Sequence, residues 1–444
     1  MPVFHHNRKK LRSSQIIILG FSGVILLGTL LLMLPFSSRE GTATSFLDAL
    51  FTSTSAVCVT GLVLHDTASY WSASGQLVIL FLIQIGGMGV ITVAASFAII
   101  SGRKISLMQR STMQEAISAP KVGGIVRLTG FIIKLTLLIE LLGAAVMAPV
   151  FFRDFGVRGL WMALFHSISA FCNAGFDLMG TEKAFSSLTG YAANPVINLT
   201  VMLLIIVGGI GFSTWDDIRT NRLRLHKYRM QSKVIFCTTA ILLAVPTVYF
   251  FFYEFTSLPA DERILCSLFQ AVTPRTAGFN TADLTLLSEP GQFIIILLML
   301  VGGSPGSTAG GMKTTTVAVL FATALSTFRQ KEDTHFFGRR IDHDVVKNAA
   351  TILLMYLVLF LAGGLAISIT EGLPMITCLF ETASAVGTVG LTLGITPYLG
   401  TLSRIILILL MFFGRVGGLT LVFAALSGTQ KIAAKLPQEK ITVG

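Results

Sequence analysis

The chain has 444 residues, of which 53% are hydrophobic and only 12% are charged, and its mean hydropathy is +0.77. A soluble protein of this length needs far more charge to cover its surface, so the composition indicates a polytopic membrane protein. The net charge of +11 does not indicate a nucleic-acid partner, because the basic residues lie in the breaks between apolar runs. Membrane topology explains that distribution.

The first apolar run, Gln15–Phe36, follows a basic N-terminus and could be mistaken for a signal peptide. It is about 22 residues long, beyond the roughly 7–15 apolar residues of a signal peptide, so we expect a retained transmembrane helix. Seven further segments are long and apolar enough to cross a bilayer, for which about 20 residues are needed. The eight predicted spans are 15–36, 75–101, 129–152, 196–214, 232–255, 291–328 (interrupted), 347–369 and 402–427.

A short motif occurs four times, once between the two spans of each pair. Each copy begins with Leu-Phe, contains Ser or Thr and ends on a glycine, and it is too short and too polar to cross a bilayer. The copies are Leu50–Gly61, Leu164–Gly175, Leu268–Gly278 and Leu379–Gly390, and their final glycines recur at intervals of about 100 to 115 residues. A second glycine signature recurs in the following span of each pair, which supports a tandem quadruplication.

We therefore predict an all-α polytopic membrane protein of four tandem helix–pore loop–helix repeats, with eight transmembrane helices around a central pore. The predicted divisions are a cytoplasmic N-terminus at 1–14, repeat 1 at 15–101, repeat 2 at 128–216, repeat 3 at 232–328 with an intramembrane loop at 302–312, repeat 4 at 347–427, and a cytoplasmic tail at 428–444.

Lys and Arg are unevenly distributed between the two sides of these spans. Most lie in the N-terminus, in the breaks at 102–127, 218–234 and 328–347, and in the tail, whereas few flank the four motifs. Cytoplasmic loops carry the excess of basic residues, so we expect a plasma-membrane protein with both termini inside and all four motifs entering from outside. The motif side carries many acidic residues. They could form an acidic vestibule that concentrates cations, or they could simply belong to ordinary acidic extracellular loops.

Each motif can form a short helix whose C-terminal end points into the membrane and presents partial negative charge to a cation. The residues after it would be extended, and their carbonyl oxygens would replace the water shell of an ion, as in potassium-selective filters. Glycine is needed where the backbone turns with positive φ. The alternative is that each glycine only lets two helices pack closely.

The third repeat contains a second polar interruption. Phe293–Val301 is apolar for about 15 Å of helix and then meets Gly302–Gly311, which is placed near the middle of a roughly 30 Å hydrocarbon core. A plug that gates permeation is one reading, and a kinked helix with no gating role is the other. The stretch nearly matches a nucleotide-binding loop, but Met312 separates the glycine from Lys313 and no strand precedes it.

Arg415 lies in the last span at about the depth of this loop. An arginine at the centre of a membrane helix costs at least about 2.5–3.5 kcal/mol, so it should face the conduit and find partners. We expect Arg415 to hold the loop shut, with Lys313 as a second positive charge. The predicted gating residues are Gly302, Gly303, Ser304, Ser307, Thr308, Gly310, Gly311, Lys313 and Arg415, and the predicted partners of Arg415 among them are Ser304, Ser307 and Thr308.

The fourfold plan, the single glycine per motif, the run Arg275–Asn280 and the Gly302–Lys313 loop together resemble the Trk/Ktr/HKT superfamily of potassium transporters, and most closely its KtrB and TrkH ion-translocating subunits. The resemblance implies a homodimer in the bacterial plasma membrane, in contact with lipid, on a cytosolic nucleotide-binding ring of KtrA/TrkA type. It also implies that the loop is a gate and that backbone oxygens coordinate K⁺ at Val59, Thr60, Gly61, Asn173, Ala174, Gly175, Thr276, Ala277, Gly278, Thr388, Val389 and Gly390.

The function expected from the sequence is K⁺ uptake, passive or coupled to Na⁺. The membrane potential supplies about 2.3 kcal/mol per charge per 100 mV, enough to accumulate a cation without an ATPase. A sodium-permeable or non-selective cation channel, and a solute carrier with a broken helix, are the alternatives. We predict neither an enzyme nor an organic cofactor, because the sequence contains no paired His/Glu ligands and no nucleophile motif.

Overall fold

The computed structural model describes residues 12–100, 105–117, 123–181 and 183–417. The predicted N-terminal segment at 1–14 lies almost wholly outside this range, as do the predicted tail at 428–444 and the end of the last repeat. Within the described residues the chain is mainly helical, with a small antiparallel hairpin of β1 (His335–Phe336) and β2 (Arg339–Arg340).

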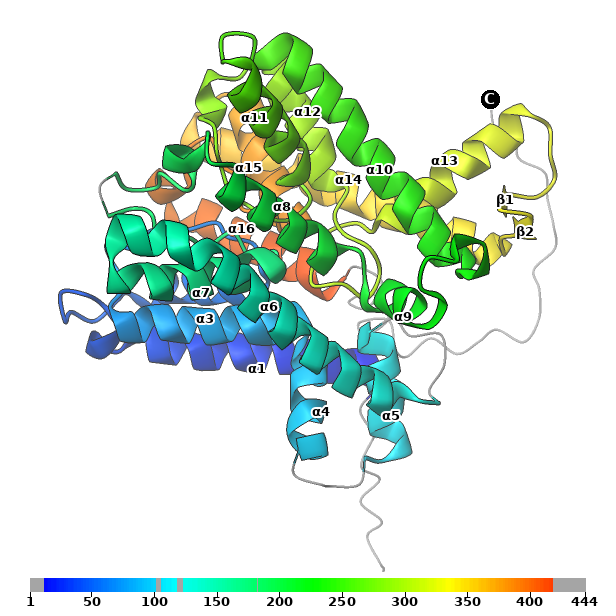
Figure 1. The fold of residues 1–444 in the computed structure, drawn as a ribbon, viewed down its shortest axis with the longest axis horizontal. Coiled ribbons are helices and arrows are strands. Elements are labelled where there is room, and N and C mark those ends of the chain that lie inside the picture. The colour runs from blue at the N-terminus through cyan, green and yellow to red at the C-terminus, as the bar shows by residue number, and fades with distance from the viewer. Residues whose placement is uncertain (1–11, 101–104, 118–122, 182, 418–444) are drawn as a thin grey trace, which may run out of the picture.

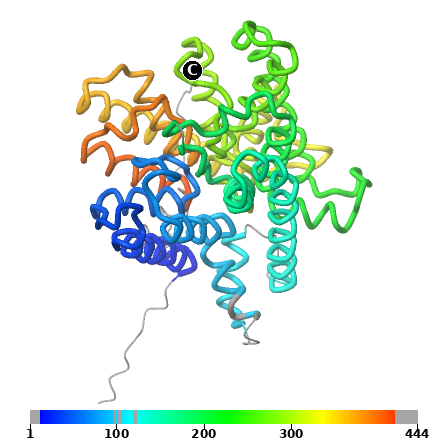
Figure 2. The backbone as a smooth tube through the Cα atoms, turned by 60° about the vertical axis from the view of Figure 1, so that its left-hand side comes forward, coloured from blue at the N-terminus to red at the C-terminus, as the bar shows by residue number. Residues whose placement is uncertain are grey.

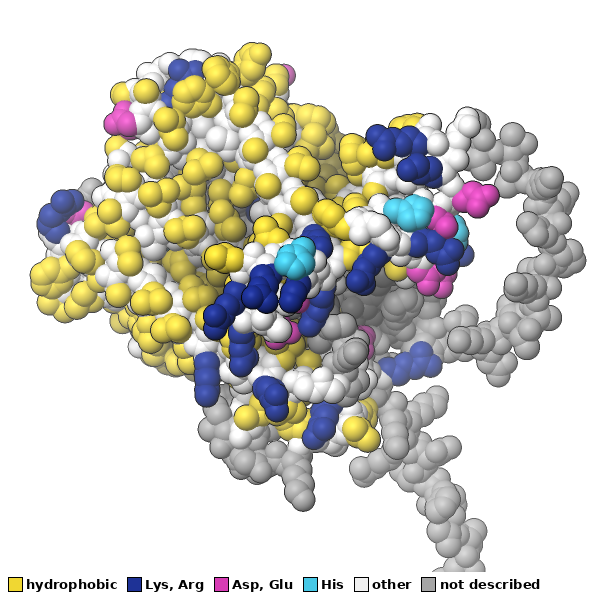
Figure 3. All heavy atoms as spheres, turned by 45° about the vertical axis from the view of Figure 1, so that its right-hand side comes forward, with side chains coloured by type: hydrophobic (Ala, Val, Ile, Leu, Met, Phe, Trp, Pro, Cys, Tyr) yellow, Lys and Arg dark blue, Asp and Glu magenta, His cyan; other side chains and the backbone are white. Residues whose placement is uncertain are grey.

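Four long apolar helices have the length and hydropathy of membrane spans. They are α1 (Ser13–Met33), α6 (Ile125–Phe155), α10 (Met230–Tyr249, continued to Glu254 by a wider turn) and α14 (His343–Glu371). Their outward faces expose Leu, Ile, Val and Phe side chains, and Figure 3 shows apolar side chains over the body of the molecule with Lys and Arg gathered at one end. Such a surface is stable in lipid, so the chain is a multi-pass membrane protein.

Each long helix is followed by a shorter one that ends at a copy of the motif. These helices are α2 (Phe46–Val57), α7 (Val157–Phe171), α11 (Ala260–Val272) and α15 (Met375–Gly387). The phenylalanine of every Leu-Phe pair is fully buried. In Figure 2 successive parts of the chain occupy successive sectors around a common centre.

A third helix completes each sector: α3 (Ala73–Met88), α8 (Pro195–Gly209), α12 (Glu289–Leu300) and α16 (Thr401–Val416). Three of them begin at a polar cap, in which Ser72, Asn194 and Ser288 each accept a hydrogen bond from a backbone N–H of the first turn. Such caps satisfy the orphan donors of a helix start. They fix the first turn of the third helix in three of the four sectors.

These helices do not continue straight. α4 (Val90–Ile100) is bent by 97° from α3, and α9 (Phe212–Asn221) by 95° from α8. The turns fall at Gly89 and Gly211, whose φ values of +85° and +94° are readily adopted only by glycine. A positive-φ glycine therefore interrupts each of the predicted spans at 75–101 and 196–214, a bend that the hydropathy pattern did not predict.

The remaining elements connect the sectors. α5 (Leu107–Ile117) follows α4, and α13 (Thr314–Phe328) follows α12 after a non-helical loop and leads away from the body (Figure 1). Single helical turns occur at Pro35–Ser37, Thr189–Tyr191, Leu225–Lys227, Leu284–Leu286 and Thr396–Tyr398.

Candidate ion pathway

The last three residues of every motif share one backbone pattern. The residue two positions before the glycine has a positive φ, +50° at Val59, +58° at Asn173, +65° at Thr276 and +53° at Thr388, and the four glycines lie between +71° and +92°. The intervening Thr60, Ala174, Ala277 and Val389 are fully buried. A positive φ at a non-glycine residue costs about 1–3 kcal/mol and persists only where the surroundings enforce it. Its recurrence in all four copies indicates a common, imposed geometry that turns carbonyl groups toward one side.

A hydroxyl on each motif helix helps to impose that geometry. It lies five or six residues before the glycine, on a Ser or Thr that is fully buried. In repeats 1 and 4 this hydroxyl accepts a hydrogen bond from the backbone N–H of the motif glycine: Ser55 from Gly61 (3.0 Å) and Ser384 from Gly390 (2.9 Å). In repeats 2 and 3 it donates to the carbonyl oxygen of the residue after the glycine: Ser169 to Phe176 (2.7 Å) and Thr273 to Phe279 (2.6 Å). Each extended segment is therefore fixed to its own helix.

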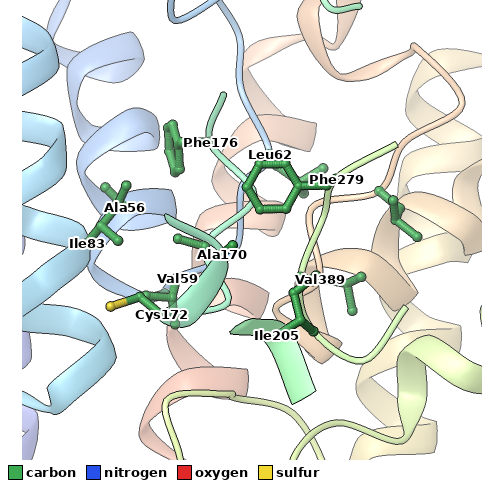
Figure 4. Close-up of a cluster of buried hydrophobic side chains, with 14 of the residues drawn as sticks. Ala56, Val59, Leu62, Ile83, Ala170, Cys172, Phe176, Ile205, Phe279 and Val389 are labelled. Atoms are coloured by element: carbon green, nitrogen blue, oxygen red, sulfur yellow. The ribbon is translucent and has the colours of Figure 1, made fainter. Parts of the chain in front are cut away.

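The four glycines form a closed ring. A β-carbon on any of them would meet the carbonyl oxygen just before the glycine of the next repeat: Gly61 meets Ala174 (2.5 Å), Gly175 meets Ala277 (2.7 Å), Gly278 meets Val389 (2.6 Å) and Gly390 meets Thr60. The order runs from repeat 1 to 4 and returns to repeat 1. Figure 4 shows Val59, Val389 and Cys172 from three of these segments in one cluster with the side chains that pack around them. All four motif ends therefore surround one axis.

Cavities lie on both sides of this ring. One, which the predicted topology makes the outer cavity, has a volume of about 140 Å³ and is lined by the four motif glycines together with Asp66 and Asp177. Burial raises the pKa of Asp177 to about 7, to which the nearby Asp66 also contributes. The second cavity, of about 330 Å³, is lined by Gly306, Met312 and other residues around the intramembrane loop. The ring of glycines separates the outer cavity from this loop.

The loop between α12 and α13 lies directly against the motif ends. The Thr308 hydroxyl is 3.0 Å from the carbonyl oxygen of Phe171 and 3.0 Å from Oδ1 of Asn173. A β-carbon on Gly310 would collide with the side chain of Thr388. The loop therefore touches the second and fourth motif segments from the side opposite the outer cavity.

Backbone hydrogen bonds connect the loop to the bend of α8 and to the end of α16. Ser304 N–H donates to Gly209 O (2.9 Å), Thr308 N–H to Gly208 O (3.2 Å) and Gly311 N–H to Gly414 O (3.2 Å), while Gly306 O accepts from Phe212 N–H (2.6 Å). Gly302 and Gly303 pair with the far side of the loop, at Met312 O and Thr314 N. Most of these partners belong to other repeats.

The two predicted cations both contact the loop. Arg415 donates to the carbonyl oxygens of Thr308 and Gly86, and to that of Gly87 at 3.2 Å. Lys313 Nζ donates to Ala309 O (2.9 Å) and Gly310 O (3.2 Å). Arg415 thus links the loop to α3.

Only one of the three predicted partners of Arg415 contacts it. Thr308 does, through its carbonyl group, whereas the Ser304 hydroxyl lies 3.2 Å from that of Thr314 and the Ser307 hydroxyl donates to Ser304 O (2.7 Å). The expectation of loop carbonyls or hydroxyls as partners of Arg415 is thus met by the carbonyl group of Thr308, whereas the hydroxyls of Ser304 and Ser307 bond to Thr314 and to Ser304 O instead.

Sequence reasoning also missed residues that the structure places beside the motif ends. The supporting hydroxyls and the carbonyl partners on α3 were not singled out, whereas Asp66 and Asp177 belong to the acidic residues that the sequence places on the motif side. The recurrence of Ser or Thr five or six residues before each glycine was visible in the aligned copies. The partners on α3 are backbone carbonyl groups, so no side chain in the sequence identifies them.

Comparison with known proteins identifies the family of this chain. The chain matches the TrkH family, described as cation transport proteins, over residues 5–435. It is 40% identical to the potassium/sodium uptake protein NtpJ of Enterococcus hirae, over 98% of both chains. It is 38% identical to the Ktr system potassium uptake protein B of Bacillus subtilis, over 97% of this chain and 96% of that one.

A solved structure shows the same fold. The potassium transporter TrkH from Vibrio parahaemolyticus superposes with a TM-score of 0.72 at 20% identity, covering 94% of this chain and 86% of that one. The resemblance seen in the motifs is confirmed, and these relatives are ion transporters and not enzymes. The chain belongs to the TrkH family of cation transport proteins.

Proposed function

We propose that the protein carries K⁺ into the cell through the axis defined by the four motif glycines, with these segments as the selectivity filter. The observation that carries the proposal is the closed ring, in which each glycine packs against the carbonyl of the next repeat. Rings of backbone carbonyls can replace the hydration shell of an ion. The names of the relatives, which are potassium or potassium/sodium uptake proteins, support the choice of ion.

In this proposal the repeats supply eight spans, the bent and broken helices included, and both termini are cytoplasmic. The Lys and Arg at one end of the molecule support that orientation (Figure 3). Reaction of single cysteines, introduced at exposed positions such as Gly41 and Arg224, with a membrane-impermeant reagent tests it. Labelling of the first from outside and of the second only after permeabilisation is expected; the reverse contradicts the orientation.

The loop at 302–312 is the gate. It lies between the filter and the second cavity and is hydrogen-bonded to α8, α9 and α16, and Arg415 of α16 connects it to α3. Displacing it would join the two cavities. Three Ktr-system proteins among the relatives support a further element of the proposal, in which a homodimer of this chain binds a cytosolic nucleotide-binding ring that moves the loop.

The test is growth of cells deficient in K⁺ uptake on low K⁺, with the chain expressed together with a regulatory subunit of the Ktr type. Rescue is expected, with saturable uptake of K⁺ and of its analogue Rb⁺. Absence of rescue, with the protein present in the membrane, contradicts the proposal.

Sodium permeability is the second candidate, because the relative NtpJ is named for both ions. The extent to which Na⁺ inhibits Rb⁺ uptake distinguishes sodium permeability from K⁺ selectivity. Strong competition at equal concentration indicates a pathway that does not discriminate between them, and weak competition supports K⁺ selectivity.

A further inference from the structure

The side chain of Asn173 lies between the gate loop and the third motif segment. Asn173 is fully buried, and it is the residue of the second segment whose φ is positive. The role that the family resemblance implies for this residue uses only its backbone oxygen. The side-chain amide takes no part in the pathway described above.

Both polar atoms of this amide are hydrogen-bonded, and their partners belong to another repeat. Nδ2 donates to the carbonyl oxygen of Arg275 (3.2 Å), which immediately precedes Thr276 in the third segment. Oδ1 accepts from the hydroxyl of Thr308 (3.0 Å) in the loop. Because a carbonyl oxygen can only accept, the amide nitrogen must face Arg275, and the amide oxygen is left for the hydroxyl, which can donate. One planar group thus joins the loop to a neighbouring motif segment.

Every polar group of Thr308 is bonded to an element outside the loop. Its N–H donates to Gly208 O (3.2 Å) and its carbonyl accepts from Arg415. Its hydroxyl carries a single proton, and two acceptors lie 3.0 Å away, Phe171 O and Asn173 Oδ1. In the described part of the chain the amide oxygen of Asn173 has no other donor.

The backbone of α8 closes this contact from one side. A β-carbon on Gly208 would collide with Phe171 O and would lie 2.8 Å from the Thr308 hydroxyl oxygen and 2.9 Å from Asn173 Oδ1. The packing leaves no space for a water molecule at this place. If the loop moved away, the amide oxygen would therefore be buried without a donor, which is unfavourable.

The other three repeats show that the backbone does not require an amide at this position. The corresponding residues, Val59, Thr276 and Thr388, have the same positive φ. Val59 has no polar side-chain atom, and the hydroxyls of Thr276 and Thr388 are buried with no hydrogen-bond partner among the described residues. Asparagine adopts a positive φ more readily than most residues, but this preference does not account for the two hydrogen bonds that only repeat 2 makes here.

We propose that the side-chain amide of Asn173 connects the gate to the filter. Its oxygen holds the closed loop through the hydroxyl of Thr308, and its nitrogen positions the third segment through the carbonyl of Arg275. Asn173 is thus a positioning residue with two separable effects, one on gating and one on ion discrimination. This inference rests on the proposed function, because it assumes that the loop is the gate and that the motif segments select the ion.

The first variant is Asn173→Gly. Glycine adopts a positive φ without strain, so this change removes both hydrogen bonds and keeps the backbone path. Rb⁺ uptake without the regulatory subunit measures release of the loop, and inhibition of Rb⁺ uptake by Na⁺ measures discrimination. Regulator-independent uptake should rise about fivefold and discrimination against Na⁺ should fall about fivefold, the effect of one lost hydrogen bond in each case.

The second variant, Thr308→Val, separates the two effects. It keeps the shape of the side chain and removes only the hydroxyl, so regulator-independent uptake should rise about fivefold. Inhibition by Na⁺ should stay as in the wild type, because the amide nitrogen of Asn173 still bonds to Arg275 O. Loss of discrimination equal to that of Asn173→Gly would contradict the separate role of the nitrogen.

The double variant tests whether the two side chains act through one hydrogen bond. If they do, regulator-independent uptake in Asn173→Gly with Thr308→Val should be no higher than in either single variant. Additive rises would mean that the hydroxyl serves Phe171 O instead, and would overturn the connection through Asn173.

A purely conformational role of Asn173 gives a different result. If asparagine is present only because it tolerates a positive φ, Asn173→Gly should equal the wild type in both measurements, at wild-type expression and thermal melting in detergent. That outcome overturns the inference. Thr136→Val is the matched control for Thr308→Val: Thr136 is fully buried on α6, its hydroxyl has no hydrogen-bond partner within the described structure, and neither measurement should change.

Failure of the inference and failure of the proposed function are distinguishable. If wild-type protein in the membrane, with its regulatory subunit, shows no saturable Rb⁺ uptake, the proposed function fails. If wild-type uptake saturates and neither Asn173→Gly nor Thr308→Val differs from it, only the connection through Asn173 fails.

Discussion

The proposed filter and the proposed gate loop both depend on glycine and lie in contact, yet they are held in different ways. Each filter segment is bonded to a hydroxyl of its own motif helix and packed against the next segment of a closed ring. The loop is held mainly by carbonyls and N–H groups of other repeats, and by one arginine. A ring cannot open at one place without disturbing all four segments, whereas fewer cross-repeat hydrogen bonds hold the loop in place. In the proposed function, glycine therefore serves both a rigid element and a movable one.

The largest expected effect comes from filling the ring. Gly278 has a φ of +80°, and a β-carbon there would lie 2.6 Å from Val389 O. Gly278→Ala should lower Rb⁺ uptake at least a hundredfold, or abolish the discrimination against Na⁺. Gly41→Ala is the control, because Gly41 has a φ of +70° with nothing within 4 Å and should keep near-normal uptake. If both variants lose Rb⁺ uptake to the same degree, the strain of a positive φ, and not the contact with the next segment of the ring, causes the loss.

The next effect concerns the gate. Arg415→Gln removes the hydrogen bonds from the guanidinium to Thr308 and α3, so the loop should open more often. Uptake without the regulatory subunit is expected to rise about tenfold, with KM unchanged because the filter is intact. If flux is unchanged at normal expression, the loop is not held by this residue.

Arg404 offers a matched control on the same helix. It bonds to Asp48 (2.8 Å) and to the carbonyls of Leu399 and Pro397 at the outer end of α16, far along the helix from the loop. Arg404→Gln should leave regulator-independent uptake at its basal level.

A smaller change is expected from Ser384→Ala. It removes the acceptor of the Gly390 N–H, and the loss of one hydrogen bond costs about 1 kcal/mol. That corresponds to about a fivefold loss of discrimination between Rb⁺ and Na⁺ in competition assays, with total flux retained. A change in flux without a change in selectivity would instead connect this residue with the gate.

The smallest effect concerns the outer cavity. Because the pKa of Asp177 is raised to about 7, this carboxyl group is neutral at pH 6 and charged at pH 8, beside Asp66. KM for Rb⁺ should therefore fall two- to threefold as the external pH rises across that interval. Asp177→Asn should remove the pH dependence, and its persistence in this variant would assign it to another group.

The sequence by itself was sufficient for the class of protein, the family and the positions of the four motif copies. Hydropathy identifies membrane spans because lipid requires about 20 apolar residues in a row. The repeat was visible because each copy keeps its Leu-Phe start and its final glycine. Arg415 was found for the same kind of reason, since a charge inside an apolar run is conspicuous.

Only the tertiary structure decided which groups meet. The partners of Arg415 on α3 and the carbonyl that faces each motif glycine are brought together by the packing of different repeats. Most of these partners are backbone carbonyls, which every residue possesses, so no side chain announces them. The bends at Gly89 and Gly211 were missed for a related reason: within an apolar run, a glycine that packs and a glycine that turns the chain look alike until their backbone angles are known.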